Sequence, residues 1–317
     1  MGNSRKVLIT GGRGYVGGRL AQYLTRATLA QPVLGSRQLR PSPDWLPAAA
    51  VAAMDWHSSE SLRRVCTGID AVVHLAGMNA QDCVSDPVGA LEFNGLATAR
   101  LLRAAIAAGV HRFVYISTAH VYASPLLGTI SEASATTSLH PYATSHRAGE
   151  DVVLYAHQRA EIDGVALRVS NSFGPPAHAG ANCWMLLVND LCRQAVTTRS
   201  MVLRSAGTQH RDFVPLTDLC RAIAHMVELP RSALGDGLYN VGGRWAPTII
   251  KMAQRIADCC AELYGFRPGI SRPEPVSHES SAELDYRIDK LLQTGFVPTA
   301  DVNSEIRATL QFCRHLT

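Results

Sequence analysis

KVLITGGRGYVGGRL, residues 6–20, is the stretch that decides the fold. Residues 6–12 form a short apolar run that ends in glycine, which predicts a buried strand, and apolar side chains then recur at helical spacing. Glycines stand between the two patterns at positions 11, 14 and 17. Glycines at this spacing let backbone N–H groups at a helix N-terminus approach a pyrophosphate. We therefore predict a dinucleotide-binding loop inside a βαβ unit; the alternative is a glycine-rich turn with a purely structural role.

Strand-like and helical patterns go on alternating after this loop. Candidate strands at 32–37, 52–56, 70–77, 111–123 and 164–175 alternate with candidate helices at 61–69, 89–109 and from Tyr142 onward. Such alternation is typical of a Rossmann-type, doubly wound parallel sheet with helices on both faces, so the expected fold class is α/β. Beyond Pro175 the regularity decays, which indicates a smaller C-terminal lobe.

These patterns also suggest how the chain is divided. We expect residues 1–172 to form an NAD(P)-binding Rossmann domain, with residues 212–244 returning to it. Residues 173–211 and 245–317 are then expected to form a substrate-binding lobe.

Composition narrows the class of protein. The 317 residues carry 30 basic and 26 acidic side chains, a formal net charge of +4, without a block of like charge, so a nucleic-acid surface is not indicated. There is no run of about 20 apolar residues, so no transmembrane helix is expected, and the N-terminal apolar run is too short for a signal peptide. The eight cysteines show no Cys-x-x-Cys spacing. We expect them to be buried, reduced thiols of a cytoplasmic protein, and we predict no metal site.

The end of the second candidate strand bears on the choice of cofactor. A carboxylate there would bind the adenosine ribose of NAD, but this chain has Gly35, Ser36 and Arg37. Nothing there repels a 2′-phosphate, Ser36 and Arg37 could hold one, and Arg13 in the glycine turn could help. We therefore favour NADP(H). NAD(H) is the alternative, in which these side chains are only solvated loop residues.

Two other strand ends are expected to contact the cofactor. Asp55 ends the third candidate strand, where it could accept a hydrogen bond from the adenine amino group, and residues 75–77 end the fourth and would pass beneath the cofactor. The contacts predicted so far are Gly11, Arg13, Gly14, Tyr15, Val16, Gly17, Ser36, Arg37, Asp55, Leu75, Ala76 and Gly77.

Further motifs extend the pattern nearly to the end of the chain. They are TGGRGYVG (10–17), HLAG (74–77), FNGLATARLL (93–102), VYISTAHVYA (114–123), PYATSHRAGE (141–150), LRVSNSFGP (167–175), GTQHRDFVPLTDL (207–219), LYNVGG (238–243) and DKLLQTGFVP (289–298). With them the chain resembles the extended short-chain dehydrogenase/reductases, the NAD-dependent epimerase/dehydratase family, whose members act mostly on nucleotide-sugars. The ensemble is much less specific to any one reaction.

The resemblance implies a catalytic set with one departure from the family. Thr118 would hydrogen-bond the reacting oxygen, and Tyr142 would give or take its proton. His146 stands where the family has a lysine that contacts the cofactor ribose and lowers the pKa of the tyrosine. Histidine can do the first task, but with an unperturbed pKa near 6.5 it is mostly neutral at pH 7. Because oxidation needs phenolate, the substitution favours reduction. In the alternative interpretation, His146 marks a protein that binds cofactor without turnover. In both cases Tyr142 and His146 are expected to contact the cofactor.

On the substrate side the resemblance points to residues in several motifs. Asn171 and Arg211 match substrate contacts, Arg211 at the diphosphate, and Asn94 matches a buried asparagine behind the active site. Alternatively, Arg211 could pair with Asp212 or Asp218. His120 could contact substrate or be a loop histidine. Family dehydratases carry Asp-Glu where this chain has residues 119–120, Ala-His, which argues against a dehydratase.

The expected function is an NADP(H)-dependent reduction of a keto group on a nucleotide-sugar. An epimerase of the same family is the nearest alternative, and a cofactor-sensing protein without turnover is the alternative from another class. The resemblance also implies a homodimer through the helix at 89–109 and the Tyr142 helix. Leu101, Leu102, Val152 and Leu154 could serve there, although ordinary core packing explains them as well.

Overall fold

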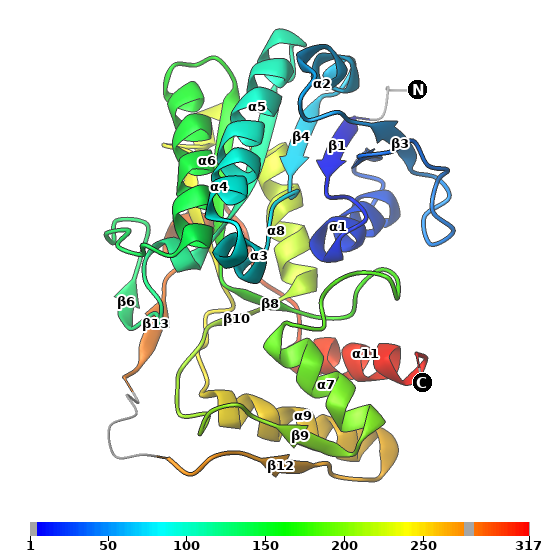
Figure 1. Ribbon diagram of the computed structural model, residues 1–317, viewed down its shortest axis with the longest axis vertical. Coiled ribbons are helices and arrows are strands. Elements are labelled where there is room, and N and C mark those ends of the chain that lie inside the picture. The colour runs from blue at the N-terminus through cyan, green and yellow to red at the C-terminus, as the bar shows by residue number, and fades with distance from the viewer. Residues whose placement is uncertain (1–4, 276–281, 317) are drawn as a thin grey trace.

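The computed structural model describes residues 5–275 and 282–316. Its centre is a seven-stranded parallel sheet in the order β11-β7-β5-β4-β1-β2-β3 (Figure 1). The strands are β1 (Lys6–Thr10), β2 (Gln31–Ser36), β3 (Ala50–Ala53), β4 (Ala71–His74), β5 (Arg112–Thr118), β7 (Asp163–Val169) and β11 (Leu238–Val241). The Rossmann-type α/β fold is therefore confirmed. Because β1 pairs with both β2 and β4, the strand order reverses beside it, which is where such sheets bind ligands.

Helices cover both faces of the sheet because its strands are apolar on both sides. In β1, Val7 and Ile9 pack against one face, with α1 (Tyr15–Arg26) and α8 (Leu216–Glu228). Leu8 packs against the other, with α2 (Ser59–Cys66), α5 (Thr98–Ala107) and α6 (Pro141–Gln158). Successive side chains of a strand alternate between faces, and parallel strands covered on both sides are apolar throughout.

The helix expected at 89–109 consists of three pieces. It begins as α4 (Pro87–Ala90), continues as a π-helical segment η1 (Leu91–Ala97) and ends as α5. Asn94 lies in the π-helical segment and is buried. π-Helical turns inside helices often occur at functional sites, and apolar spacing alone cannot distinguish one from a regular helix.

The strand expected at 164–175 is also divided. β7 stays in the main sheet, whereas β8 (Asn171–Phe173) leaves it and pairs with β10 (Phe213–Pro215). Between them Ser170 donates its backbone N–H to Val241 and its hydroxyl to Asp212. These two bonds redirect the chain toward the smaller lobe.

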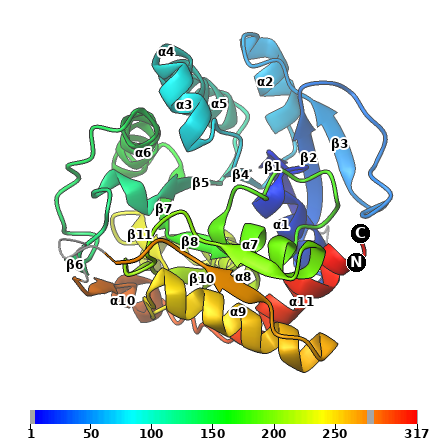
Figure 2. The same ribbon diagram turned by 60° about the horizontal axis from the view of Figure 1, so that its bottom comes forward.

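A second group of elements lies beyond the carboxyl ends of the main strands, at the bottom of Figure 1. Its apolar core joins α7 (Leu187–Thr197), α9 (Ile249–Tyr264) and α11 (Val302–Arg314), beside the pair β9 (Ser200–Val202) and β12 (Gly269–Ser271). In Figure 2, α9 and α11 lie in front of the sheet. Other described elements are β6 (Gly128–Ile130) paired with β13 (Leu284–Tyr286), α3 (Ala80–Ser85), η2 (Ala119–Val121), η3 (Arg231–Ala233) and α10 (Asp289–Gln293). Within the described ranges, no helix is both long and apolar enough to cross a bilayer.

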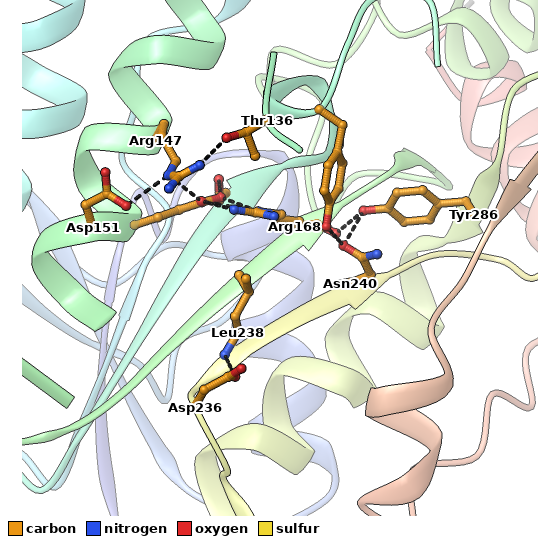
Figure 3. A network of polar contacts seen from close by, with 11 residues as sticks. Thr136, Arg147, Asp151, Arg168, Asp236, Leu238, Asn240 and Tyr286 are labelled. Carbon is orange, nitrogen blue, oxygen red and sulfur yellow. Dashed lines mark hydrogen bonds and ion pairs between the residues drawn. The ribbon is translucent and has the colours of Figure 1, made fainter. Parts of the chain in front are cut away.

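A buried polar network attaches α6 to the sheet (Figure 3). Glu150 on α6 forms an ion pair of 2.8 Å with Arg168 on β7, and the two side chains are 0% and 3% exposed. Ser117 on β5 donates to the same carboxylate at 2.5 Å. The Tyr286 hydroxyl lies 2.8 Å from the Arg168 carbonyl and 3.0 Å from Asn240 Oδ1 and shares its one hydrogen between them, so β13 is held against the same strand.

Candidate active site

The glycine loop brings backbone very close to backbone. Gly11 has φ +67°, a left-handed conformation that favours glycine. A Cβ at Gly17 would lie 2.3 Å from the Gly11 oxygen, so α1 can begin here only without a side chain at 17. Gly14, the N-cap of α1, offers no side-chain cap. The first N–H groups of the helix are therefore available to an anion.

A cavity of about 1100 Å³ opens beside this loop, at the carboxyl ends of β1, β2 and β4. The predicted cofactor residues that line it are Gly11, Arg13, Gly14, Ser36, Arg37, Leu75, Ala76 and Gly77. Gly35, Gln38, Arg40, Met54, Trp56, Met78, Asp82 and Phe93 also line it and were not foreseen. The cavity fits a dinucleotide: it has a pyrophosphate cradle, an apolar side and a basic end.

Other predicted cofactor residues lie outside that lining. Tyr15 is buried and donates to the Gly174 carbonyl at 3.1 Å, and Val16 packs against the core beneath the loop. Asp55 points away, and its carboxylate accepts the His57 N–H at 2.9 Å. Asp55 points outward because successive side chains still alternate in direction past the end of β3, which turns residues 54 and 56 inward and residue 55 outward.

The basic end of the cavity lies beyond β2. Arg13, Arg37 and Arg40 line it together with Ser36. Arg13 donates to the Pro41 carbonyl at 2.7 Å, and its Nε is buried without a hydrogen-bond partner in the described part of the chain. No acidic side chain among the described residues lies within 4.0 Å of these three guanidinium groups. Such a set suits a phosphate.

Residues 75–77 form the floor of the cavity. Buried hydrogen bonds hold this floor from below. The Thr10 hydroxyl accepts the N–H groups of Leu75 and Ala76 at 3.1 and 3.2 Å and contacts His74 Nδ1 at 2.6 Å. His74 Nε2 contacts the Thr98 hydroxyl at 2.9 Å. Burial lowers the pKa of His74 to about 3, so this imidazole is neutral and joins the two threonines as one donor and one acceptor.

Asn94, in the π-helical segment, extends this series of buried hydrogen bonds. Its carbonyl accepts the Thr98 hydroxyl at 2.6 Å, and its side-chain oxygen accepts the Met78 N–H at 2.8 Å. The side-chain amide donates to Ser145 on α6 at 3.0 Å. Asn94 is 1% exposed, so it supports the floor and does not line a substrate pocket.

Thr118 and Tyr142 meet where β5 ends and α6 begins. Thr118 is the last residue of β5, and Tyr142 is the second residue of α6, whose N-cap His140 accepts the Tyr142 N–H at 3.2 Å. Burial raises the pKa of Tyr142, and hydrogen bonding by the Thr118 hydroxyl partly opposes this rise. The phenol is therefore protonated at neutral pH.

His146 lies one turn along α6 and is 7% exposed. Its ring meets the Tyr142 ring edge to face, with centroids 4.5 Å apart. Its Nδ1 lies 2.9 Å from the Tyr115 hydroxyl, and its Nε2 lies 3.8 Å from where a Cβ of Gly77 would stand. Burial lowers the pKa of His146 to about 4, so the imidazole is neutral at pH 7.

The arginine next to His146 does not supply the missing charge. Arg147 is not among the residues that line the cavity; it pairs with Asp151 at 2.9 Å and also contacts Thr136 (Figure 3). The helix period places consecutive residues about 100° apart, which explains why Arg147 cannot follow His146 inward.

Three predicted substrate residues line a second, smaller cavity of about 200 Å³: His120, Asn171 and Arg211. It adjoins the phenol, because the rings of His120 and Tyr142 are 6.3 Å apart. Ser124, Pro125, Leu126, Gln209, His210 and Leu284 complete its lining.

Arg211 does not pair with the acids that flank it in sequence. Asp212 accepts from Ser170 and from the Gly243 N–H, whereas Asp218 pairs with Arg221 at 2.8 Å. Within the described ranges no carboxylate comes within 4.0 Å of the Arg211 guanidinium. Burial lowers the pKa of Arg211, as expected for a cation without a bound anion.

Sequence reasoning missed Tyr115, His74, Thr10 and Thr98. Each is buried next to the site and acts through another residue. The sequence signal for Thr10, His74 and Tyr115 was a polar side chain inside an otherwise apolar strand, and for Thr98 a polar side chain on the apolar face of a helix. Such groups need hydrogen-bond partners when they are buried.

Comparison with known proteins agrees with this architecture. A sequence model of the NAD dependent epimerase/dehydratase family matches residues 7–242. The chain is 28% identical over 293 residues to a dTDP-glucose 4,6-dehydratase of Streptomyces niveus, covering 88% of this chain and 84% of that one. It is 28% identical over 337 residues to a UDP-glucose 4-epimerase of Azospirillum brasilense, covering 99% and 93%.

Among solved structures, the UDP-glucuronic acid 4-epimerase of Bacillus cereus in complex with UDP-glucuronic acid and NAD superposes with a TM-score of 0.80. The two are 22% identical, and the superposition covers 98% of this chain and 100% of that one. Identity this low shows a shared fold alone.

Proposed function

The chain belongs to the NAD-dependent epimerase/dehydratase family of enzymes, and on that premise we propose that it reduces a keto group on a nucleotide-sugar with NADPH. One observation carries the choice of reduction. The neutral imidazole of His146 lies beside a protonated phenol, with ring centroids 4.5 Å apart.

The proposed roles follow from the protonation states. When bound, NADPH supplies the hydride that the carbonyl carbon accepts. Tyr142 gives its proton to the developing alkoxide, and Thr118 hydrogen-bonds the same oxygen. Oxidation would need phenolate, and with a pKa above 10 fewer than about one phenol in a thousand is ionised at pH 7. The resting form of the site is thus the form that reduction uses.

The second cavity supports a nucleotide-sugar as the substrate class. Arg211 lacks an acidic partner in the described structure and can bind a diphosphate through two parallel N–H bonds. Asn171 and His120 share that cavity and would face the sugar. We propose that residues 173–211 and 245–317 supply the remaining substrate contacts. An elimination is disfavoured although a dehydratase is among the relatives, because Ala119 and His120 offer no acid–base carboxyl pair.

We favour NADP(H) over NAD(H) because β2 ends without a carboxylate and three arginines line the cavity there. The solved neighbour holds NAD, so the preference needs its own test. Fluorescence titration should show NADPH binding at least about ten-fold tighter than NADH, and Arg37→Ala should abolish the difference. Equal or tighter binding of NADH would contradict the preference.

The reaction can be tested with a panel of nucleoside-diphosphate keto-sugars. A reductase oxidises one NADPH for each sugar consumed, seen as loss of the reduced nicotinamide absorbance. An epimerase would instead retain its cofactor through purification and interconvert two sugars without net NADPH loss. If neither the wild type nor His146→Lys turns over any sugar while both bind NADP(H), the cofactor-sensing alternative holds.

We also propose a homodimer and a cytoplasmic location. Val88, Leu91, Leu96 and Tyr155, on α4, η1 and α6, are 47–68% exposed and would be covered by a second copy. Sedimentation should give twice the chain mass, and Leu96→Asp should yield monomers. Leu101 and Leu102 lie on α5 with their side chains buried in the core, so they cannot form an interface. The eight buried, free cysteines fit a reducing compartment.

A further inference from the structure

The Tyr115 hydroxyl occupies a position that decides which nitrogen of His146 carries the proton. It lies 2.9 Å from His146 Nδ1 and 3.5 Å from the Asn94 carbonyl. The phenol has one hydrogen for these two acceptors and for the Thr98 hydroxyl, which also lies beside it. The Asn94 carbonyl already accepts the Thr98 hydroxyl at 2.6 Å, and 3.5 Å is long for an O–H donor. The shorter contact therefore takes the hydrogen.

We propose that Tyr115 is a positioning residue that donates to His146 Nδ1 and holds His146 as its Nε2–H tautomer. The only N–H of the ring then lies on the edge nearest Gly77, where Cε1 and Nε2 are 3.7 and 3.8 Å from the position of a Gly77 Cβ, on the floor of the cofactor cavity. The purpose of this orientation rests on the proposed function: the N–H would donate to a ribose hydroxyl of the nicotinamide half, which is the contact that the family lysine makes.

The opposite tautomer would make a poorer set of contacts. An Nδ1–H ring would donate to the Tyr115 oxygen and leave the phenol hydrogen the long contact to Asn94 or the Thr98 hydroxyl, which is already engaged with His74 Nε2 and the Asn94 carbonyl. It would also turn a bare lone pair toward Gly77, so the ring could accept but not donate there. His146 Nε2 has no hydrogen-bond partner among the described residues, and thus nothing else fixes the ring from that side.

The test begins with the cofactor-free protein. Long-range ¹H–¹⁵N correlation spectra distinguish protonated from unprotonated ring nitrogens, and the His146→Asn spectrum identifies the signals of His146. We expect the wild type to show Nε2–H and Tyr115→Phe to show a mixture of tautomers. Tyr239→Phe is the matched control, because it loses a buried hydroxyl that donates to the Leu234 carbonyl at 2.6 Å on the far edge strand. An Nδ1–H ring in the wild type, or an unchanged ring in Tyr115→Phe, would overturn the proposal.

NADPH affinity provides the second measurement. Tyr115→Phe should weaken binding about three- to ten-fold, the range expected for one misdirected hydrogen bond, while Tyr239→Phe leaves it unchanged. Equal losses in both variants would overturn the positioning role in favour of a general packing effect. A wild type that binds no dinucleotide would refute the proposed function, whereas the tautomer spectra would still decide the role of Tyr115.

Discussion

Replacing His146 by lysine should create the charge that this site lacks. The rings of Tyr142 and His146 are 4.5 Å apart, so an ammonium there would lie roughly 5 Å from the phenol oxygen. With an effective dielectric constant of about 20, the attraction between an ammonium and a phenolate at this separation is about 3 kcal/mol. That energy lowers the pKa of Tyr142 by about 2 units.

The assay follows the ionisation of the phenol directly. Ultraviolet difference titration detects tyrosinate, and subtracting the Tyr142→Phe form of each protein isolates the signal of Tyr142. His146→Gln is the matched control, because glutamine is polar but uncharged. We expect the wild type and His146→Gln to ionise above pH 10 and His146→Lys about 2 units lower. Because oxidation needs phenolate, the ascending limb of kcat/KM for alcohol oxidation should shift to lower pH by the same amount.

Two results would refute the electrostatic reasoning. If Tyr142 of the wild type ionises near pH 7, the neutral-imidazole description of the site is wrong. If the glutamine and lysine variants shift the ionisation equally, the cause is the loss of the imidazole and not the gain of charge.

Three further predictions concern the frame of the site. Gly17→Ala should weaken NADPH binding at least about 100-fold by fluorescence titration, because its Cβ would lie 2.3 Å from a loop carbonyl oxygen, whereas Gly269→Ala, whose Cβ meets nothing within 4 Å, should bind normally. Glu150→Gln should lower the free energy of unfolding in urea by about 3–5 kcal/mol, since it leaves the Arg168 guanidinium buried and unpaired; a loss below 1 kcal/mol would contradict this. Because burial lowers the pKa of His146 to about 4, only the unfolded chain takes up this proton as the pH falls from about 6.5 to 4. Wild-type stability should therefore decrease over that window by about 3 kcal/mol more than that of His146→Gln, and parallel pH curves would count against it.

The sequence by itself determined the features that depend on neighbours along the chain. Glycines at 11 and 17 act on the turn that contains them, and the absence of a carboxylate after β2 is a property of residues 35–37. The strand–helix alternation follows from periodicities of two and about 3.6 residues, which are local. The parallel sheet, the nucleotide loop and the Tyr142–His146 pair on one helix face could all be predicted in this way.

Tertiary structure decided what depends on contacts between distant segments. Whether Asp55 or Trp56 faces the cavity depends on where β3 ends, and the burial of Asn94 depends on a π-helical turn with the same apolar spacing as a regular helix. From its sequence position His146 could be assigned only the ordinary histidine pKa near 6.5, which makes it mostly neutral at pH 7 but does not fix its charge. It is fixed because α6 presses the ring against Tyr115, 31 residues away, and removes it from water. Desolvation depends on everything packed around a group, so no local pattern encodes it.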